Sequence, residues 1–548
     1  MNKQLNLKYS SHFPAKGLSL LEITDDKSGF SLISSHGNPK VRSAAYKGWL
    51  AARHSRAPGD TKAIAIEMGE KGVDPDAKLD VTYKGYGHGS VADGARLDVH
   101  FNNVPMIVPF ALFHRGYINS GQEKSTRYQV EFTDKPLHEI KNYVPIDLDS
   151  KDLELLSNEY QSIGFAQLKN FQGFLADIQE KYEDFYGPVP KKAKNAFTSR
   201  SLDTARFMLL LGQNTGFAYE TSARDWERHI SYMKGHDMEI FRRTGFLLNN
   251  LLAPDTFIEE DLGIKAEAPT LLKYTKPNTT TKNLIKELTT NDRQTRFKSV
   301  KLNEQKTALS NSDMALAAIT QLYLANVPNL NSRNKIMNWI DNLSLNKKKA
   351  LSQHIFSNYT HHDELPGIFR TTGLVATLDT QLGEIRDWNR HKSVGRFIQG
   401  LPTIYQLGLT RTTAKETVNN GFGVPSYLNI PEFEELKVNY LDLMNRHYDN
   451  IVDFQDTLEK VVGKESDYSV IQNLLPLGHS ARISMHMTPQ DVNYITKLRT
   501  RPGGHINYRE QAHKLGQLIE NINPLLSGLK LKDEKPDPSS KQQFYDRG

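Results

Sequence analysis

The sequence predicts a mixed α/β (α+β) protein in which an antiparallel sheet is flanked by long helices and the whole plan occurs twice. Segments that alternate apolar and polar residues, typical of half-buried strands, are interspersed with segments of helical spacing. Two of the helical segments, 153–182 and 432–462, are unusually long. The order loop, strand, helix recurs in both halves, which predicts two diverged copies of one fold.

Length and composition indicate a globular protein of several domains. The chain has 548 residues, which suits two to four domains, and its 38% hydrophobic and 24% charged residues are ordinary values. No apolar run approaches the roughly 18 residues of a membrane span, and the first residues lack the apolar segment of a signal peptide. We therefore expect a cytoplasmic protein without a membrane partner.

Residue counts exclude some chemistry. The chain has no cysteine, which excludes disulfides, thiolate metal sites and cysteine nucleophiles. The net charge of +6 is compatible with an anionic small ligand and also with nucleic acid. The chain contains neither a Walker phosphate loop nor a Gly-x-Gly-x-x-Gly motif. His361-His362-Asp363 is a metal candidate, although a polar loop is the simpler interpretation, and we expect no metal.

In the first half, periodicity and breakers predict alternating helices and strands. Ser222 is a good N-cap for a helix that runs to Lys234. The expected helices are two within 41–70, then 105–113, 153–182, 191–211, 222–234 and 239–252; the expected strands are 97–101 and 215–221, with a glycine-rich loop at 85–90.

The second half repeats this plan. The expected helices are 312–326, 333–358, 381–392, 432–462 and 489–498, and the expected strands are 368–378 and 481–487. Leu211-Gly212 recurs as Leu477-Gly478 and Asp225 as Asp491, both at a spacing of 266 residues. We divide the chain into a first repeat (1–255), a linker (256–310), a second repeat (311–528) and a loose charged tail (529–548).

The segment from Leu112 to Tyr128, LFHRGYINSGQEKSTRY, concentrates donors that suit a phosphate-bearing ligand. Arginine matches phosphate oxygens two at a time, and serine adds a neutral hydroxyl donor. A basic helix end followed by a polar loop is the plainer interpretation. The same chemistry returns 277 positions after His114, in Arg390-His391-Lys392, which favours a functional corner in both halves.

Four ordered segments of the first half carry a resemblance to the flavin-dependent (X-type) thymidylate synthases. That family has a signature Arg-His-Arg, then Ser-x-Arg, preceded by a Gly-His-x-Ser/Thr flavin loop. The segments here are Tyr86-Gly87-His88-Gly89-Ser90 with Asp93, Phe113-His114-Arg115 with Glu123-Lys124-Ser125-Thr126-Arg127, Ala205-Arg206-Phe207-Met208-Leu209, and Thr221-Ser222-Ala223-Arg224.

The second half resembles the family through Arg386 to Lys392 and through Leu474-Leu475-Pro476-Leu477, and it departs further. No Ser-x-Arg follows Lys392, and Gln490 stands where the repeat register places Arg224. In the first half Phe113 replaces the first arginine of the signature, Asp93 stands where the family usually has glutamate, and the loop to Ser125 is about two residues longer.

The resemblance implies methylation of dUMP to dTMP with FAD, with methylenetetrahydrofolate as carbon donor and NADPH as reductant. This route needs no cysteine nucleophile, in agreement with the composition. The residues it implies for substrate and catalysis are Ser125, Arg127 and Arg224, with Glu123 and Arg390 also at the substrate. Those it implies for the cofactor are His88, Ser90, Asp93, His114, Arg115, Arg390, His391 and Lys392.

Several alternatives stay open at this point. The chain is either such an enzyme, a paralogue acting on another nucleotide or on a base in nucleic acid, or a non-catalytic nucleotide- or flavin-binding protein. His88 is alternatively a turn residue, and Trp226 and Trp388 are expected in the core. Arg386 and Arg390, one turn apart, repel each other unless an anion lies nearby, and we expect an external one.

A fused duplication also predicts an assembly. In the family that the chain resembles, sites form between the subunits of a tetramer. Two copies of a duplicated chain would rebuild that arrangement, so we expect a homodimer that forms a pseudo-tetramer. Each site would be composite, with the loop at 123–127 and the corner at 390–392 converging on one ligand pair.

Overall fold

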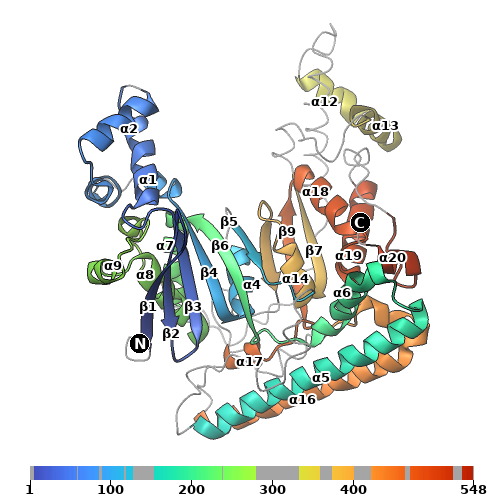
Figure 1. The fold of residues 1–548 in the computed structure, drawn as a ribbon. Coiled ribbons are helices and arrows are strands. Elements are labelled where there is room, and N and C mark those ends of the chain that lie inside the picture. Colours follow the sequence, from blue (N-terminus) through green and yellow to red (C-terminus); the bar gives the residue numbers. More distant parts are fainter. Residues whose placement is uncertain are drawn as a thin grey trace, which may run out of the picture.

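The computed structural model shows a mixed α+β protein with two antiparallel sheets and long helices (Figure 1). It describes residues 5–58, 60–85, 89–115, 119–127, 153–236, 238–278, 333–357, 373–399, 421–462, 469–522 and 534–546. His88, the predicted helix at 312–326 and the His361-His362-Asp363 cluster lie outside these residues. Within them, no helix combines the length and the apolar character of a membrane span.

The larger sheet has six strands in the order β1-β2-β3-β4-β6-β5, with every neighbouring pair antiparallel. Its N-terminal strands were not predicted, because the residues that face the core include polar ones such as Ser19 and Asp25. The strands are β1 (Leu7–Ala15), β2 (Leu18–Asp25), β3 (Phe30–His36), β4 (Arg96–Pro105), β5 (Asn119–Glu123) and β6 (Asn214–Ser222).

The helices of the first half follow the predicted pattern, except that the helix expected at 191–211 ends at Ala205. Ser222 caps α7 by accepting the Asp225 N–H, and Trp226 is fully buried, as expected. Residues 107–114 are all buried in α4, with Pro109 in the first turn, where its missing N–H has no intrahelical partner to lose. The helices are α1 (Ser43–His54), α2 (Thr61–Glu70), α4 (Ile107–Arg115), α5 (Glu154–Tyr186), α6 (Lys194–Ala205), α7 (Ala223–Lys234) and α8 (Glu239–Leu252).

The smaller sheet repeats the central part of the larger one. Its order β7-β9-β8 matches β4-β6-β5 in direction, connection and flanking helices. The strands are β7 (Leu374–Gln381), β8 (Gly395–Gln399) and β9 (Ser480–Met487), and the helices are α14 (Leu382–Trp388), α16 (Glu434–Val462), α17 (Ser469–Asn473), α18 (Pro489–Thr500) and α19 (Ile506–Ile522).

Backbone hydrogen bonds relate the two halves by an approximate twofold axis. The Leu211 N–H donates to the Leu475 carbonyl (3.0 Å), and the Leu477 N–H donates to the Leu209 carbonyl (2.7 Å). Adding 266 to 211 gives 477 and adding 266 to 209 gives 475, so one bond is the image of the other. The axis passes at the Leu210–Pro476 bridge. The next two hydrogen bonds are also related by the spacing of 266: the Gly212 N–H donates to the Asn473 carbonyl, and the Gly478 N–H donates to the Phe207 carbonyl.

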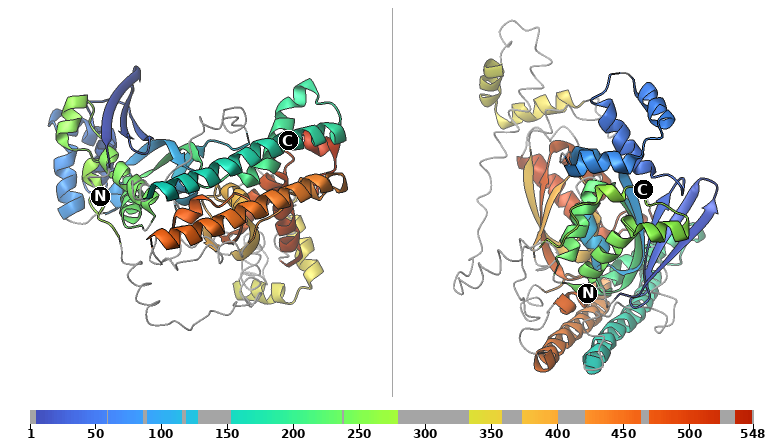
Figure 2. Two further views of the ribbon diagram at one scale, coloured as in Figure 1. Left: turned by 90° about the horizontal axis from the view of Figure 1, so that it is seen from below. Right: turned by 90° about the vertical axis from the view of Figure 1, so that its left-hand side faces the viewer.

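The long helices α5 and α16 are also related across this axis. They pack antiparallel and side by side along one edge of the molecule (Figures 1 and 2). Lys181 near the end of α5 faces Glu435 at the start of α16, and at the other end of the pair Glu159 faces Thr457. Between these ends the rings of Phe174 and Tyr440 lie 5.7 Å apart.

Residues 256–278, assigned from the sequence to the linker, belong to the first half in the structure. They form α9 (Thr256–Leu262) and η10 (Pro269–Leu271). Arg42 pairs with Glu259 at 2.6 Å, and the Ala45 N–H donates to the Glu267 carbonyl. Any linker therefore begins after residue 278.

Two further expectations are corrected. The tail was expected to be loose, but within 534–546 the helix α20 (Lys541–Tyr545) buries Phe544, and Arg200 donates to the Phe544 and Asp546 carbonyls. The single helix expected at 333–358 is two, α12 (Arg333–Asp341) and α13 (Leu345–Ile355), because Ser344 caps the start of the second.

Candidate functional site

The structure places the predicted site residues in two clusters. One cluster, called the sheet end below, lies where β4 and β5 begin and β6 ends. The other, called the seam, lies between the two halves. The sheet end contains the predicted residues Ser90, Asp93, Arg224 and Lys392 together with Arg96, which the sequence did not single out; the seam contains the predicted residues His114, Glu123, Ser125, Arg127 and His391.

At the sheet end, Arg224 lies over the glycine-rich loop. Residues 89–93 form a short 3-10 turn, η3 (Gly89–Asp93). The Arg224 Nη1 atom is 3.0 Å from the Asp93 Oδ2 atom. A Cβ atom on Gly89 would lie 3.5 Å from the Arg224 guanidinium carbon, so the glycine lets the arginine lie close against the loop. Two predicted segments, the loop with Asp93 and the start of α7 with Arg224, therefore meet.

Lys392 from the second half reaches the same place. Its Nζ atom donates to the Asn119 carbonyl at 2.5 Å. Asn119 and Arg96 pair with Thr221 and Ser222 of β6, one on each side of that strand. Burial lowers the pKa of Lys392, while the nearby Glu220 carboxylate opposes that shift. The sheet end thus gathers cations from both halves, and Arg390, which is exposed, lies two residues from Lys392.

The two histidines of the predicted corners are buried and neutral. Burial and the charge of Arg396 lower the pKa of His114 to about 3, and its Nδ1 atom is 3.3 Å from the Asn389 Oδ1 atom. The Arg499 Nε–H donates to His391 Nε2 at 2.8 Å, which requires an unprotonated nitrogen there. Burial, reinforced by the charge of Arg499, holds the pKa of His391 well below its usual value.

Arg115 packs against α7. Its guanidinium carbon lies 3.8 Å from the centre of the Tyr232 ring, a cation–π contact on the α7 side of the sheet. The helix that carries the second corner is also shorter than predicted, because α14 ends at Trp388, and Arg390 to Lys392 follow it as a turn. Trp388 is buried, as expected.

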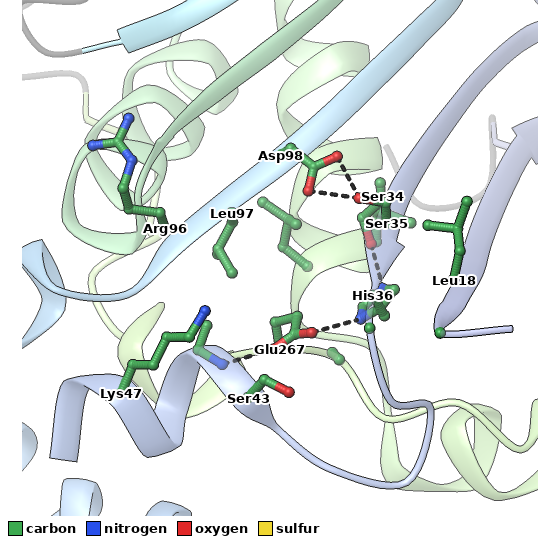
Figure 3. A pocket seen from close by; sticks show the side chains of 16 residues that line it. Leu18, Ser34, Ser35, His36, Ser43, Lys47, Arg96, Leu97, Asp98 and Glu267 are labelled. Carbon is green, nitrogen blue, oxygen red and sulfur yellow. Dashed lines mark hydrogen bonds and ion pairs between the residues drawn. The ribbon is translucent and has the colours of Figure 1, made fainter. Parts of the chain in front are cut away.

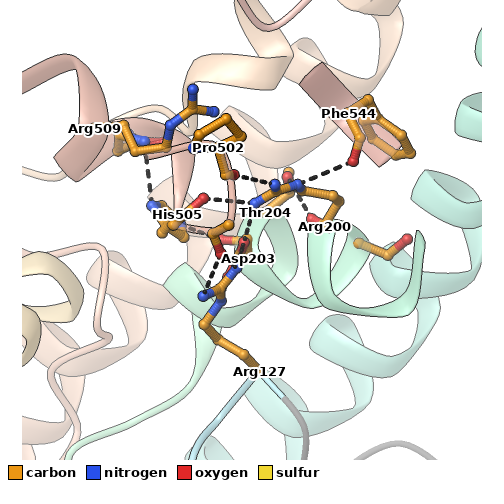
Figure 4. Close-up of polar contacts among 12 residues, drawn as sticks. Arg127, Arg200, Asp203, Thr204, Pro502, His505, Arg509 and Phe544 are labelled. Carbon is orange, nitrogen blue, oxygen red and sulfur yellow. Dashed lines mark hydrogen bonds and ion pairs between the residues drawn. The ribbon is translucent and has the colours of Figure 1, made fainter. Parts of the chain in front are cut away.

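In the seam, the predicted nucleotide-binding residues are paired with protein groups. The Arg127 guanidinium makes a two-pronged contact with the Asp203 carboxylate, Nε–Oδ1 at 2.5 Å and Nη2–Oδ2 at 2.8 Å (Figure 4). The Ser125 hydroxyl accepts the Arg127 backbone N–H at 3.2 Å. Asp203 is fully buried, so its carboxylate takes the position that the sequence assigns to a ligand phosphate.

A second correction concerns Glu123 and Arg386. They form an ion pair between the halves, and each side chain is only 9% exposed. The anion expected beside Arg386 is therefore a carboxylate of the protein instead of an external one. Together with the Lys392–Asn119 contact, this pair places β5 against α14 and the turn that follows it, with Glu123 at the end of the strand on α14 and Asn119 at its start on Lys392. These two contacts lie at opposite ends of β5, so the convergence of the loop at 123–127 with the corner at 390–392 stays a prediction.

The seam also contains charged residues that the sequence did not single out. Asp203 lies beside Arg200, which donates to the Gly504 carbonyl, and His505 Nε2 bonds the Asp203 carbonyl at 2.8 Å (Figure 4). Burial acts to raise the pKa of Asp203, but Arg127 and His505 outweigh it and hold that pKa below its usual value. Of the predicted segments, those that carry Arg127 and Arg206 reach this region, but neither identified Asp203, Arg200 or His505.

Arg206 reaches Asp387 across the seam, with Nη2–Oδ2 at 3.3 Å. Burial acts to raise the pKa of Asp387, but Arg206, Arg390 and Arg499 outweigh it and hold the pKa far below its usual value. Glu384 shows the opposite behaviour, since burial raises its pKa to about 8. Its Oε1 atom has no hydrogen-bond partner within the described part of the chain.

The sheet end fits an anionic cofactor better than the seam does. Its cations are partly exposed: Arg224 is 37% and Arg96 39% exposed at the side chain, and each faces a carboxylate that is also exposed. Exposed pairs exchange partners at a cost of at most about 1 kcal/mol. A dinucleotide such as FAD would be held there by Ser90, Arg224 and Lys392, whereas the charge of Arg390 acts on Asp387 in the seam.

No model of a known protein family matches the chain, and no curated protein matches its sequence.

Proposed function

We propose that the protein is a flavin-dependent enzyme that transfers a methyl group to a pyrimidine nucleotide, in the manner of dUMP to dTMP conversion. Methylenetetrahydrofolate and NADPH are its proposed co-substrates. The observation that carries the proposal is the meeting of three distant segments at the sheet end: the turn at Gly89–Asp93, Arg224 at the start of α7, and Lys392 after α14.

Each group at the sheet end has a proposed task. Arg224 exchanges Asp93 for a phosphate oxygen of the cofactor, because their ion pair is half exposed and contributes little to stability. Lys392 adds charge from the second half, and Ser90 adds a neutral donor from the turn. FAD, when bound, supplies the reducing chemistry, while these residues bind and orient it.

The seam residues have a positioning task in this proposal. Arg127 fixes the segment after β5 to α6 through Asp203, and Glu123 fixes the end of β5 to α14 through Arg386. These two pairs hold the sheet end of the first half at a set distance from the second corner. The nucleotide base would then contact this junction, with its phosphate at the exposed cations.

The proposed assembly is a homodimer that forms a pseudo-tetramer. The approximate twofold axis at Leu210 and Pro476 already makes one chain equivalent to a dimer. Two such chains would give the closed arrangement that composite sites require. Size-exclusion chromatography with light scattering measures it directly, and a monomer at micromolar concentration would contradict it.

A non-catalytic nucleotide- or flavin-binding protein is the second candidate, and the Arg127–Asp203 pairing favours it. A carboxylate that occupies both prongs of the predicted phosphate-binding arginine is what a site that has lost its substrate would show. Under this candidate the sheet end still binds a ligand, but no methyl transfer follows.

Two measurements separate the candidates. The first is a flavin titration followed by absorbance and fluorescence, and the second is a dUMP methylation assay with labelled methylenetetrahydrofolate, FAD and NADPH. The enzyme binds FAD and forms dTMP, whereas the binding protein binds FAD or a nucleotide without turnover. Absence of both flavin binding and dTMP formation would reject the proposed enzyme. Arg228→Ala is the matched control for Arg224→Ala, since Arg228 is exposed on the same helix and pairs with Asp225.

A further inference from the structure

A cavity of about 440 Å³ lies beside the sheet end (Figure 3). The ends of β3 and α8, the starts of β2, β4 and α1, and residues 266–267 form its walls. This volume is within the range of small-molecule sites. The strands β1 to β3 have no counterpart among the described residues of the second half, so the cavity belongs to the first half alone.

His36 lies on the inner wall with one ring nitrogen unmatched. The residue is 3% exposed, and its Nε2 atom lies 2.7 Å from the Ser34 hydroxyl. Its Nδ1 atom has no hydrogen-bond partner in the described part of the chain. Burial lowers the pKa of His36 to about 4, so the ring is neutral near pH 7. An unmatched buried nitrogen is costly, because no hydrogen bond compensates for the water that it loses on burial.

Glu267 faces His36 without bonding it, and one donor placed beside both atoms could serve the two as acceptors. The Glu267 Oε1 atom is 3.7 Å from His36 Nδ1, too far for a hydrogen bond. The other oxygen, Oε2, accepts the Ala44 N–H at 2.7 Å, and the Glu267 carbonyl accepts the Ala45 N–H. The carboxylate is thus fixed in place with one oxygen directed towards His36.

The mouth of the cavity carries positive charge, opposite to the Glu267 carboxylate on the inner wall. Lys47 is exposed there and makes no hydrogen bond or ion pair with the residues that the structure describes, and Arg96 lies further along the rim (Figure 3). Leu18, Leu97, Leu251 and Leu252 line the remaining surface. The inner wall therefore offers acceptors, the mouth offers cations, and the surface between them is apolar.

We propose that this cavity binds a small zwitterion of the amino-acid class. Its ammonium group donates to Glu267 Oε1 and His36 Nδ1, and its anionic group lies at Lys47. An ammonium has three donors, so it matches both atoms with one to spare. A plain amine would leave Lys47 unpaired, and a plain anion would meet the Glu267 carboxylate. The proposed ligand contacts Glu267, His36 and Lys47 are not among the proposed flavin contacts, and Arg96 on the rim is the residue that the cavity and the sheet end have in common. The titrations of the two ligands therefore test the two proposals separately.

Binding is tested by calorimetric titration and thermal shift with a panel of probes. The panel holds the protein-forming amino acids and the straight-chain ω-amino acids of up to six carbons, each beside its amine and its carboxylic acid analogue. We expect at least one zwitterion to bind more than tenfold tighter than both of its analogues. If none binds, or if an analogue binds equally well, the cavity holds only water and the proposal is overturned.

Variants identify the site. Glu267→Gln keeps an acceptor for the Ala44 N–H but removes the charge, and Lys47→Ala changes only the rim. Both should weaken the zwitterion at least tenfold without lowering the melting temperature by more than a few degrees. Glu22→Gln is the control, because Glu22 faces His12 at 2.8 Å outside the cavity. Binding that survives both cavity variants would overturn the assignment, whatever the flavin titration shows.

Discussion

The seam and the sheet end use similar residues in opposite ways. In the seam, Arg127 is 13% exposed and faces Asp203, which has no exposed surface. At the sheet end, Arg224 is 37% exposed and faces Asp93, which is 51% exposed. The two pairs consist of the same chemical groups, but they differ in their exposure to solvent.

This difference separates a structural pair from a site that a ligand can enter. Removing one partner of a buried pair leaves an uncompensated charge in the interior, whereas water replaces the lost partner of an exposed one. A ligand phosphate can therefore displace Asp93 from Arg224 at small cost, but displacing Asp203 from Arg127 would require the seam to open.

Asp203→Ala should give the largest loss of stability. It leaves Arg127 and Arg200 facing each other in the interior without a carboxylate, which corresponds to about 3–5 kcal/mol. Unfolding in urea, followed by circular dichroism, measures the change. Asp93→Ala is the control, with an expected change below about 1 kcal/mol. Equal losses in the two variants would remove the distinction between seam and sheet end.

Glu384 in the seam should make stability depend on pH. Its pKa is raised to about 8 from an ordinary value of 4.5, so the folded carboxyl stays protonated while the unfolded one ionises. The resulting cost is absent below pH 4.5 and grows to a few kcal/mol as pH rises to 8. Glu384→Gln does not bear this cost.

The stability gained by Glu384→Gln over the wild type should therefore increase between pH 5 and pH 8, as measured by urea unfolding. The contribution of Glu22 to stability depends on pH in the opposite direction. Burial acts to raise its pKa, but its hydrogen bonds to Ser31 and His12 outweigh burial and lower that pKa. The stability that Glu22 contributes is present above its unfolded pKa and is lost as pH falls. A gain for Glu384→Gln that stays constant with pH would contradict the assignment.

The twofold relation between the halves predicts a matched pair of glycine effects. A Cβ atom on Gly212 would lie 2.7 Å from the Asn473 carbonyl oxygen, and one on Gly478 would lie 3.0 Å from the Phe207 carbonyl oxygen. Gly212→Ala and Gly478→Ala should each lower the free energy of unfolding by about 1–3 kcal/mol. Gly173→Ala, in α5 with nothing within 4 Å, should instead raise it by up to about 1 kcal/mol. A neutral result at one of the two axis positions would show that the packing there is not symmetric.

Local patterns predicted the helices well, because apolar spacing and capping act within a few residues. The helices at 222–234 and 239–252 agree with α7 and α8 to within one residue. The spacing of 266 between Leu211 and Leu477 is the one that the backbone hydrogen bonds follow. The hairpin of β2 and β3 was missed because Asp25, on the buried face, is compensated by Arg243 of α8, a partner 218 residues away.

The candidate site could be predicted only in part for the same reason. Sequence motifs located Arg127 and Arg224 but could not distinguish them, since what differs is the burial of Asp203 and Asp93. Whether the two donor groups of an arginine are available depends on residues from other elements. Spacing along the chain does not contain that information, whereas the geometry of the fold does.

The smallest expected change in stability comes from Arg224→Ala. Comparing this variant with Arg127→Ala is the sharpest test of the difference between the two regions. Arg224→Ala removes an exposed cation, so unfolding should change by less than about 1 kcal/mol. FAD affinity should nevertheless fall at least tenfold, because a charged donor to a phosphate is lost. Fluorescence titration of FAD and urea unfolding of the same preparation give both numbers, with Arg228→Ala as the control that changes neither.

Arg127→Ala should behave in the reverse manner. It leaves the buried Asp203 carboxylate without its two-pronged partner, so stability falls by several times more than for Arg224→Ala. The sequence predicts that this variant weakens nucleotide binding more than flavin binding, because Arg127 lies in the Ser-x-Arg segment. The geometry instead predicts that dUMP and FAD affinities, measured well below the unfolding midpoint, change by the same factor, because the Arg127–Asp203 pair positions both binding regions and contacts neither ligand. Selective loss of dUMP affinity in a folded Arg127→Ala protein would show that the seam opens to admit a nucleotide, and the distinction between the two regions would then describe only the ligand-free state.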